Sequence, residues 1–265
     1  MVHGIDEDVE SKLNWEDLNY WRSGEWQVVE ERLDDMDKVG QLYNPERQLL
    51  FAALDATPLE KVRVILVGQD PYPNGKYSTG LAFSIPKDAK THPPTLVTLL
   101  KEYVDDLHYA YPKNGNLEKW ASQGVLLWNA IPSCEAGKSL SHDWVEWSHL
   151  TKEIIQLLSQ THNVVFVLLG GVARRYSQYV DTTTNDLIET GHPSPRGNLT
   201  SKVPFTGSRI FSRINACLCK RGKDPIDWRL DTLTNVPNGK TLIPPWEGED
   251  AFRKKQIRSD NSQPL

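Results

Sequence analysis

Three polar side chains of different chemistry each stand just beyond a short apolar run of the chain. They are the carboxyl of Asp70, the amide of Asn129 and the imidazole of His192. A carboxylate can stabilise positive charge and orient a water molecule, an imidazole can donate a hydrogen bond to a developing anion, and an amide offers both a donor and an acceptor. These groups suit the polar cleavage of a bond, although their types and spacing do not by themselves name a reaction.

The apolar runs before these side chains predict the strands of a buried sheet. Four such runs stand out, at residues 62–67, 125–128, 164–169 and 187–188. The first and third are continuous and rich in β-branched residues, which is typical of strands buried on both faces. Residues with helical periodicity separate the runs, and they predict helices at residues 95–107, 144–160 and 172–179.

This alternation predicts an α/β fold. We expect a single domain with a central, twisted, four-stranded parallel sheet and helices on both faces. Each predicted strand ends in polar or glycine-rich residues, including Gly170-Gly171 after the third. Because ligands of open α/β sheets bind at the carboxyl ends of the strands, Asp70, Asn129 and His192 should meet in one pocket there.

The segments that flank the predicted sheet differ in character. Residues 1–13 form an acidic leader, and residues 14–38 carry apolar residues at helical spacing after Asn14, a plausible helix cap. Residues 47–54 are expected to form another helix. Residues 231–265 are rich in proline, glycine and charge, so we expect an irregular tail and assign the catalytic domain to residues 14–230.

Composition limits the class of protein. The chain has 265 residues, of which 38% are hydrophobic, enough for one sizeable core. No apolar stretch approaches the length of a membrane span, and the acidic N-terminus lacks the apolar region of a secretory signal. Three cysteines without metal-ligand spacing favour free thiols and no metal site. We therefore expect a protein that is not secreted: cytoplasmic in a bacterial or virus-infected cell, or nuclear if eukaryotic.

Charge is unevenly distributed along the chain. Residues 1–60 hold 5 basic and 15 acidic side chains, whereas residues 61–265 hold 25 and 20, for a net charge of −5 overall. A mildly basic body permits contact with phosphate groups without proving it.

Short motifs add a family resemblance. Residues 68–72 read Gly-Gln-Asp-Pro-Tyr, and residues 80–84 read Gly-Leu-Ala-Phe-Ser. These segments resemble the catalytic loop of family 1 uracil-DNA glycosylases, which cleave the N-glycosidic bond of uracil in DNA. Other segments fit the same family in order: His-Pro-Pro-Thr at 92–95, Gly-Val-Leu-Leu-Trp-Asn at 124–129, Gly-Gly at 170–171 and His-Pro-Ser-Pro at 192–195.

The resemblance implies roles for residues of the predicted pocket. Asp70 would stabilise the sugar cation and orient the attacking water, and neutral His192 would donate to an oxygen of the departing uracil. Asn129 would distinguish uracil from cytosine, because its amide complements N3–H and O4 of uracil. Phe83 would stack on the flipped base and Tyr72 would exclude the methyl group of thymine. The backbone N–H groups of Gln69 and Asp70 would bind a uracil oxygen.

The resemblance also implies a DNA-binding surface. Loops that clamp the DNA backbone correspond to Pro93, Pro94 and Thr95, to Gly170 and Gly171, and to Ser194. Arg196 stands where the family usually has the leucine that fills the gap left by the flipped nucleotide, and Leu199 is the rival candidate because the loop is longer than expected. Pro73 and Thr79 replace usual histidines, and Gly171 replaces a usual serine.

The resemblance implies no cofactor and no metal, with uracil-containing DNA, single- or double-stranded, as the substrate. We expect a monomer, and a DNA-mimicking inhibitor protein of these glycosylases as a possible partner. Two alternatives remain open. Pro73 and the tail would fit a weakly active relative that serves as a DNA-binding scaffold. A nucleotide-binding α/β module would need a phosphate-binding glycine motif, and the sequence contains none.

Overall fold

The computed structural model describes residues 13–161 and 163–230, and its centre is a four-stranded sheet. The strands are β2 (Val64–Gly68), β3 (Val125–Asn129), β5 (Val165–Leu169) and β6 (Asp186–Thr190). All of them are parallel, in the order β3-β2-β5-β6. The predicted α/β fold with a parallel sheet is therefore confirmed.

The strands form where the sequence places apolar runs. Every residue of β2, β3 and β5 is buried, whereas the edge strand β6 is buried at only two of its five positions. In the register of the sheet, Gly68 at the end of β2 lies opposite Asn129 at the end of β3. The carboxyl ends of these two neighbouring strands therefore stop side by side, which brings the polar residues that follow them together.

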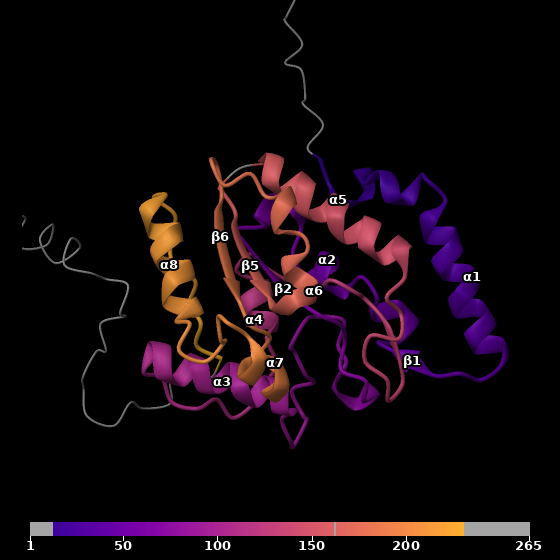
Figure 1. The fold of residues 1–265 in the computed structure, drawn as a ribbon, viewed down its shortest axis with the longest axis horizontal. Coiled ribbons are helices and arrows are strands. Elements are labelled where there is room, and N and C mark those ends of the chain that lie inside the picture. The colour runs from indigo at the N-terminus through magenta and orange to yellow at the C-terminus, as the bar shows by residue number, and fades with distance from the viewer. Residues whose placement is uncertain (1–12, 162, 231–265) are drawn as a thin grey trace, which may run out of the picture.

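Helices cover the sheet from two sides. In Figure 1, α8 (Ile210–Lys220) lies on one side beside α3 (Pro94–Leu107), and α5 (Val145–Thr161) lies on the other with α1 (Glu25–Lys38) outside it. The short helix α7 (Pro195–Thr200) lies next to α3 at the arrowhead end of the strands. Three more short helices complete the unit: α2 (Ala52–Ala56), α4 (Glu118–Ala121) and α6 (Gly170–Arg174).

A second, smaller sheet lies beside the first. Strands β1 (Tyr43–Asn44) and β4 (Cys134–Glu135) pair in antiparallel fashion. This pairing holds the loop of residues 136–142 close to the residues that follow β2, since the N–H of Gly137 donates to the carbonyl oxygen of Pro73 at 2.8 Å. Sequence analysis predicted neither of these strands.

Several helix predictions need correction. Residues 172–179 do not form one helix, because α6 ends at Arg174 and a separate 3-10 turn follows at Ser177–Tyr179. Residues 47–54 likewise split into a 3-10 turn (Arg47–Leu49) and α2. Asn14 does cap a helical segment, but that segment is a 3-10 turn. The helix α8 was not predicted. Residues 1–12 of the leader and the whole predicted tail lie outside the described residues.

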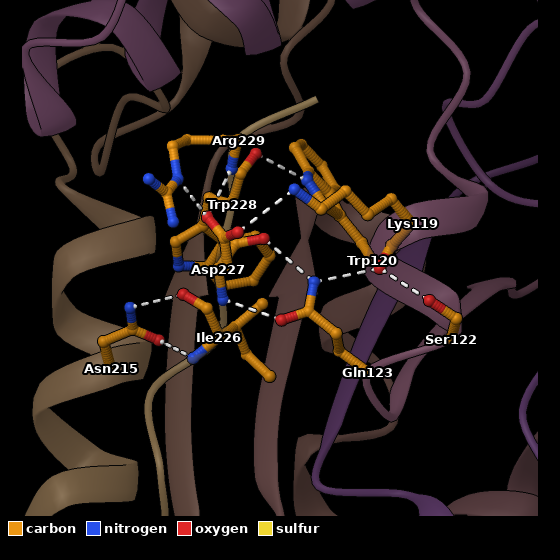
Figure 2. A network of polar contacts seen from close by, with 9 residues as sticks. All are labelled: Lys119, Trp120, Ser122, Gln123, Asn215, Ile226, Asp227, Trp228 and Arg229. Carbon is orange, nitrogen blue, oxygen red and sulfur yellow. Dashed lines mark hydrogen bonds and ion pairs between the residues drawn. The ribbon is translucent and has the colours of Figure 1, made fainter. Parts of the chain in front are cut away.

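The segment Ile226–Arg229, near the end of the described chain, is fastened to the body by a network of polar contacts (Figure 2). The amide of Asn215 in α8 accepts from Ile226 N–H at 2.8 Å and donates to Ile226 C=O at 3.0 Å. The amide of Gln123 forms the same two bonds with the backbone of Asp227. Because Gln123 comes just before β3, this network lies at the amino end of the sheet, opposite the polar strand ends.

The ranges that the structure describes contain no helix long and apolar enough to cross a membrane.

Candidate active site

A pocket of about 840 Å³ opens at the carboxyl ends of the strands. It brings together all six residues that sequence analysis assigned to catalysis and base recognition: Gln69, Asp70, Tyr72, Phe83, Asn129 and His192. Five of the predicted DNA-binding residues also line it: Thr95, Gly170, Gly171, Ser194 and Arg196. Pro93 and Pro94 lie at the start of α3 and do not line the pocket. Leu199 belongs to α7, and its side chain lies outside the described part of the structure.

The absence of a side chain at Gly68 lets two recognition residues approach each other. A Cβ built on Gly68 would lie 2.9 Å from Asn129 Oδ1 and 3.0 Å from Phe83 Cζ. A side chain at this position would therefore push the amide of Asn129 and the ring of Phe83 out of place. The last residue of β2 is therefore a glycine against which the amide of Asn129 and the ring of Phe83 both pack.

Asn129 ends β3 and is nearly buried, with 7% of its surface exposed. Its side-chain amide forms no hydrogen bond with any other described residue of the chain, although it lines the pocket. Since buried amides are normally paired, this donor and acceptor are available to a ligand.

Phe83 and Tyr72 are fixed relative to each other. Phe83 adopts a positive φ of 66°, a backbone conformation that residues other than glycine rarely take. Its carbonyl oxygen accepts a hydrogen bond from the Tyr72 hydroxyl at 3.0 Å, and the preceding Ala82 N–H donates to Leu127 C=O in β3 at 2.9 Å. Burial raises the pKa of Tyr72, so the hydroxyl stays protonated and able to donate. The Phe83 ring thus faces the pocket in a fixed position.

His192 is held in one tautomer. Its Nδ1 accepts from the N–H of Ser194 at 3.1 Å, so in the neutral ring the proton is on Nε2. Burial lowers the pKa of His192 to about 4, against the opposing effect of the Asp70 charge, and the ring is therefore neutral at pH 7. The ring centroids of His192 and Phe83 lie 5.9 Å apart. His192 can consequently donate from Nε2 without carrying charge.

Two glycines make room for this histidine. Gly170, at a φ of +91°, would place a Cβ 2.7 Å from His192 Cβ, and Gly197 would place one 2.9 Å from the same atom. Glycine is therefore needed at position 170 to make room for His192, whether or not this residue also contacts DNA.

Asp70 accepts hydrogen bonds from uncharged donors only. Its Oδ1 accepts from Gln69 Nε2 at 2.9 Å, and its Oδ2 accepts from Ser139 Oγ and from Leu140 N–H, both at 2.6 Å. In the described residues Asp70 forms no ion pair. The carboxylate thus lies at the pocket with no cation among the described residues to neutralise it.

Several residues that line this site were not assigned from the sequence, and three of them carry polar contacts or charge. Ser139 and Leu140 reach Asp70 from the loop after β4, and Arg174 lines the pocket from the end of α6. The Nε of Arg174 is buried and has no hydrogen-bond partner among the described residues. The spacing of Arg174, one helical turn beyond Gly170-Gly171, could have indicated it, whereas no local pattern marks Ser139.

Pro73, which stands in place of the expected histidine, lines the pocket as well. Its carbonyl oxygen accepts from Asn44 Nδ2 and from Gly137 N–H, each at 2.8 Å. Pro73 thus joins the catalytic loop to the smaller sheet through its backbone. Among the described residues, in the pocket or outside it, no group of three His, Cys, Asp or Glu side chains could hold a metal ion.

The sequence model of the uracil DNA glycosylase superfamily matches residues 54–218, more than half of the chain. The chain belongs to this superfamily. The match runs from α2 to α8 and so includes every strand of the main sheet and all the recognition and catalytic residues predicted above.

Relatives within the uracil DNA glycosylase superfamily cover most of the chain. It is 39% identical over 211 residues to the uracil-DNA glycosylase of Sinorhizobium medicae, covering 79% of this chain and 86% of that protein. It is 38% identical over 218 residues to the uracil-DNA glycosylase of Lacticaseibacillus casei, covering 78% and 94%. The crystal structure of mimivirus UNG Y322L in complex with UGI superposes with a TM-score of 0.73 at 27% identity, covering 81% of this chain and 87% of that one.

Proposed function

We propose that this chain is a family 1 uracil-DNA glycosylase in which Asp70 and His192 carry the chemistry and Asn129, Phe83 and Tyr72 select the base. Membership of the superfamily gives the activity itself: the chain hydrolyses the N-glycosidic bond of uracil in DNA and leaves an abasic site for base-excision repair. The observation that carries the residue assignment is a single pocket that holds an uncompensated carboxylate, a neutral imidazole and an unpaired amide.

Base selection follows from the amide of Asn129. Uracil presents a donor at N3–H and an acceptor at O4, which the acceptor and donor of the amide complement, whereas cytosine presents the reverse pattern. The Phe83 ring offers a face for stacking, and Tyr72 closes the pocket where thymine would place its methyl group. An extruded base bound in this way is read by its own edge rather than by its partner in the duplex.

Bond cleavage separates charge. As the bond between C1′ and the base breaks, its electron pair leaves with uracil and the sugar becomes cationic. His192 donates from Nε2 to a uracil oxygen and stabilises the anion, while the Asp70 carboxylate stabilises the cation. A water oxygen then bonds to C1′, the water loses a proton, and the uracil anion is protonated on release. A neutral histidine is sufficient to donate this hydrogen bond. The lowered pKa of His192 keeps the ring in that neutral form.

The DNA strand is proposed to lie across the rim of the pocket. Thr95 at the start of α3, Gly171 at the start of α6 and Ser194 before α7 all line that rim and come from separate loops. Pro93 and Pro94 would contact the strand outside the pocket. Arg196, exposed in the first turn of α7, would fill the space vacated by the flipped nucleotide, with Leu199 as the rival residue.

The partners and location of the enzyme are also proposals. We propose a monomer that needs no cofactor and acts in the cytoplasm of a bacterial or virus-infected cell, or in the nucleus of a eukaryotic one. We further propose that a DNA-mimicking inhibitor protein binds the same rim. The mimivirus structures in complex with UGI support this, since their fold is that of this chain.

The test is the release of free base from oligonucleotides in which one position is uracil, thymine or cytosine, with a metal chelator present. We expect uracil alone to be released from single strands and duplexes, at a rate that the chelator leaves unchanged. A folded protein that binds the uracil strand and releases nothing would instead be a DNA-binding scaffold. Activity that is lost in chelator and restored by zinc would contradict the metal-free mechanism.

A further inference from the structure

The loop after β4 reaches Asp70 with two donors from adjacent residues. The hydroxyl of Ser139 and the N–H of Leu140 both donate to Asp70 Oδ2 at 2.6 Å, although they lie about 70 positions further along the chain. Charge-assisted bonds of this length are among the stronger ones in proteins. Ser139 Oγ also accepts from Gln69 Nε2 at 3.3 Å, and the same nitrogen donates to Asp70 Oδ1 at 2.9 Å. The three side chains therefore form a closed ring of hydrogen bonds.

The loop is built to present these donors. Leu140 adopts a φ of +61°, a left-handed conformation that disfavours residues with a Cβ, and this conformation accompanies the bond from its N–H to Asp70. Both sides of the loop are tied down. Ser141 Oγ accepts from Glu135 N–H at 2.7 Å and donates to Lys138 C=O at 2.8 Å. Ala136 N–H donates to Leu42 C=O at 2.8 Å.

The three donors limit the number of acceptor positions that the Asp70 carboxylate can offer to a ligand or water molecule. An ionised carboxylate has about four acceptor positions, two on each oxygen. Ser139 and Leu140 occupy both positions on Oδ2, and Gln69 occupies one on Oδ1. One acceptor position on Oδ1 therefore remains for a water molecule. Without Ser139, the carboxylate could rotate and a second position would open.

We propose that Ser139 is a positioning residue for the reaction: its hydroxyl holds the Asp70 carboxylate so that one oxygen position accepts the attacking water. This inference rests on the proposed role of Asp70. Pro73 supplies no polar side chain next to Asp70, and in the described ranges Gln69 and Ser139 are the two side chains that donate to the carboxylate. In this proposal Ser139 acts through Asp70, to which its hydroxyl donates directly.

The first experiment separates binding from chemistry. Ser139→Ala is expected to lower the rate of uracil release at saturating enzyme in a single turnover by about 10-fold, the value of one hydrogen bond to a charged group. Its affinity for uracil-containing DNA should change by less than about 2-fold, because among the described residues the Ser139 side chain forms hydrogen bonds with Asp70 and Gln69 alone. Ser139→Thr keeps the hydroxyl and should restore most of the rate. Loss of affinity with an unchanged rate would overturn the proposal.

Lys138→Ala is the matched control, since Lys138 is the exposed neighbour on the same loop. Within the described ranges its side chain pairs with Glu135 alone. We expect it to leave the rate unchanged. An equal loss of rate in Lys138→Ala would show general sensitivity of the loop and overturn the assignment of Ser139.

The deciding experiment is a double-mutant cycle with Asp70→Ala. In that background the serine has no carboxylate to hold, so adding Ser139→Ala should change the residual rate by less than about 2-fold. A further 10-fold loss would show that Ser139 acts independently of Asp70, which contradicts the proposal. If Asp70→Ala itself retains the wild-type rate, the proposed role of Asp70 fails instead, so the two failures are distinguishable.

Discussion

The two ends of the sheet carry the same kinds of polar side chain in opposite states. At the carboxyl end, the Asn129 amide has no hydrogen-bond partner among the described residues, and Asp70 is held by uncharged donors. At the amino end, the Asn215 amide both donates to and accepts from the backbone of Ile226, and Asp227 pairs with Lys119 and Arg229 (Figure 2).

This difference separates structural from functional polar groups. A buried amide costs free energy unless it is paired, and at the amino end that pairing fastens the Ile226–Arg229 segment to the body. At the carboxyl end the chain leaves the amide for a ligand. Residue type and burial together would not distinguish Asn129 from Asn215, since both are asparagines and both are nearly or fully buried. Their hydrogen-bond partners do.

The largest expected effect concerns the charged and donor groups of the pocket. Asp70→Asn and His192→Ala should each lower single-turnover uracil release by about 10² or more, because aimed electrostatic stabilisation is lost. DNA binding, measured by a mobility shift, should persist in both variants. Asp227→Asn is the control: it removes a carboxylate that has partners of its own and should leave the rate unchanged. A folded Asp70 or His192 variant with a near wild-type rate would remove that residue from the mechanism.

A smaller effect is expected for base selection. Asn129→Asp should lower uracil release by about 10- to 100-fold, since an ionised carboxylate accepts but cannot donate to O4. The same variant should admit some cytosine, whose exocyclic amine is a donor. The assay compares release from uracil and cytosine oligonucleotides of one sequence. Unchanged selectivity would mean that another group reads the base.

The smallest expected effect concerns the residue that occupies the vacated space. Arg196→Ala should slow excision from duplex DNA more than from single strands, by about 5- to 10-fold in the ratio of rates, since unstacking costs a few kcal/mol in the duplex. Arg196→Leu should recover much of the duplex rate with a shallower dependence on salt, because one phosphate contact is lost. If Leu199→Ala alone lowers the ratio, Leu199 is the wedge and Arg196 contacts phosphate.

The main sheet was predictable from sequence for a physical reason. Strands buried on both faces need continuous apolar residues, and a parallel sheet gathers whatever follows them at one edge. The pocket of Asp70, Asn129 and His192 follows from those two facts and was found where it was expected. The shape of the pocket around Asn129 also depends on Gly68, whose lack of a side chain admits both the amide and the Phe83 ring.

Other features depend on contacts that the pattern of apolar residues does not show. The expected helix at residues 172–179 is interrupted where Ser177 Oγ donates to Arg174 C=O, a local bond that competes with the helical one. The break in the expected helix at residues 47–54 lies where Gly80 approaches the Leu49 carbonyl. Ser139 could not be identified because the pairing of β1 with β4 brings its loop to the catalytic segment. By contrast, Ile210, Ile214 and Leu218 of α8 recur at helical spacing, so that helix was detectable.

The most direct test of this account compares the two buried asparagines in one measurement. Single-turnover uracil release is measured for Asn129→Ala and Asn215→Ala at a temperature where circular dichroism shows both to be folded. We expect Asn129→Ala to lose about 10-fold or more in rate, and Asn215→Ala to keep the wild-type rate while unfolding at a lower temperature. An Asn215→Ala variant that loses as much rate as Asn129→Ala, or an Asn129→Ala variant that loses none, would contradict the assignment of function to the unpaired groups at the carboxyl end.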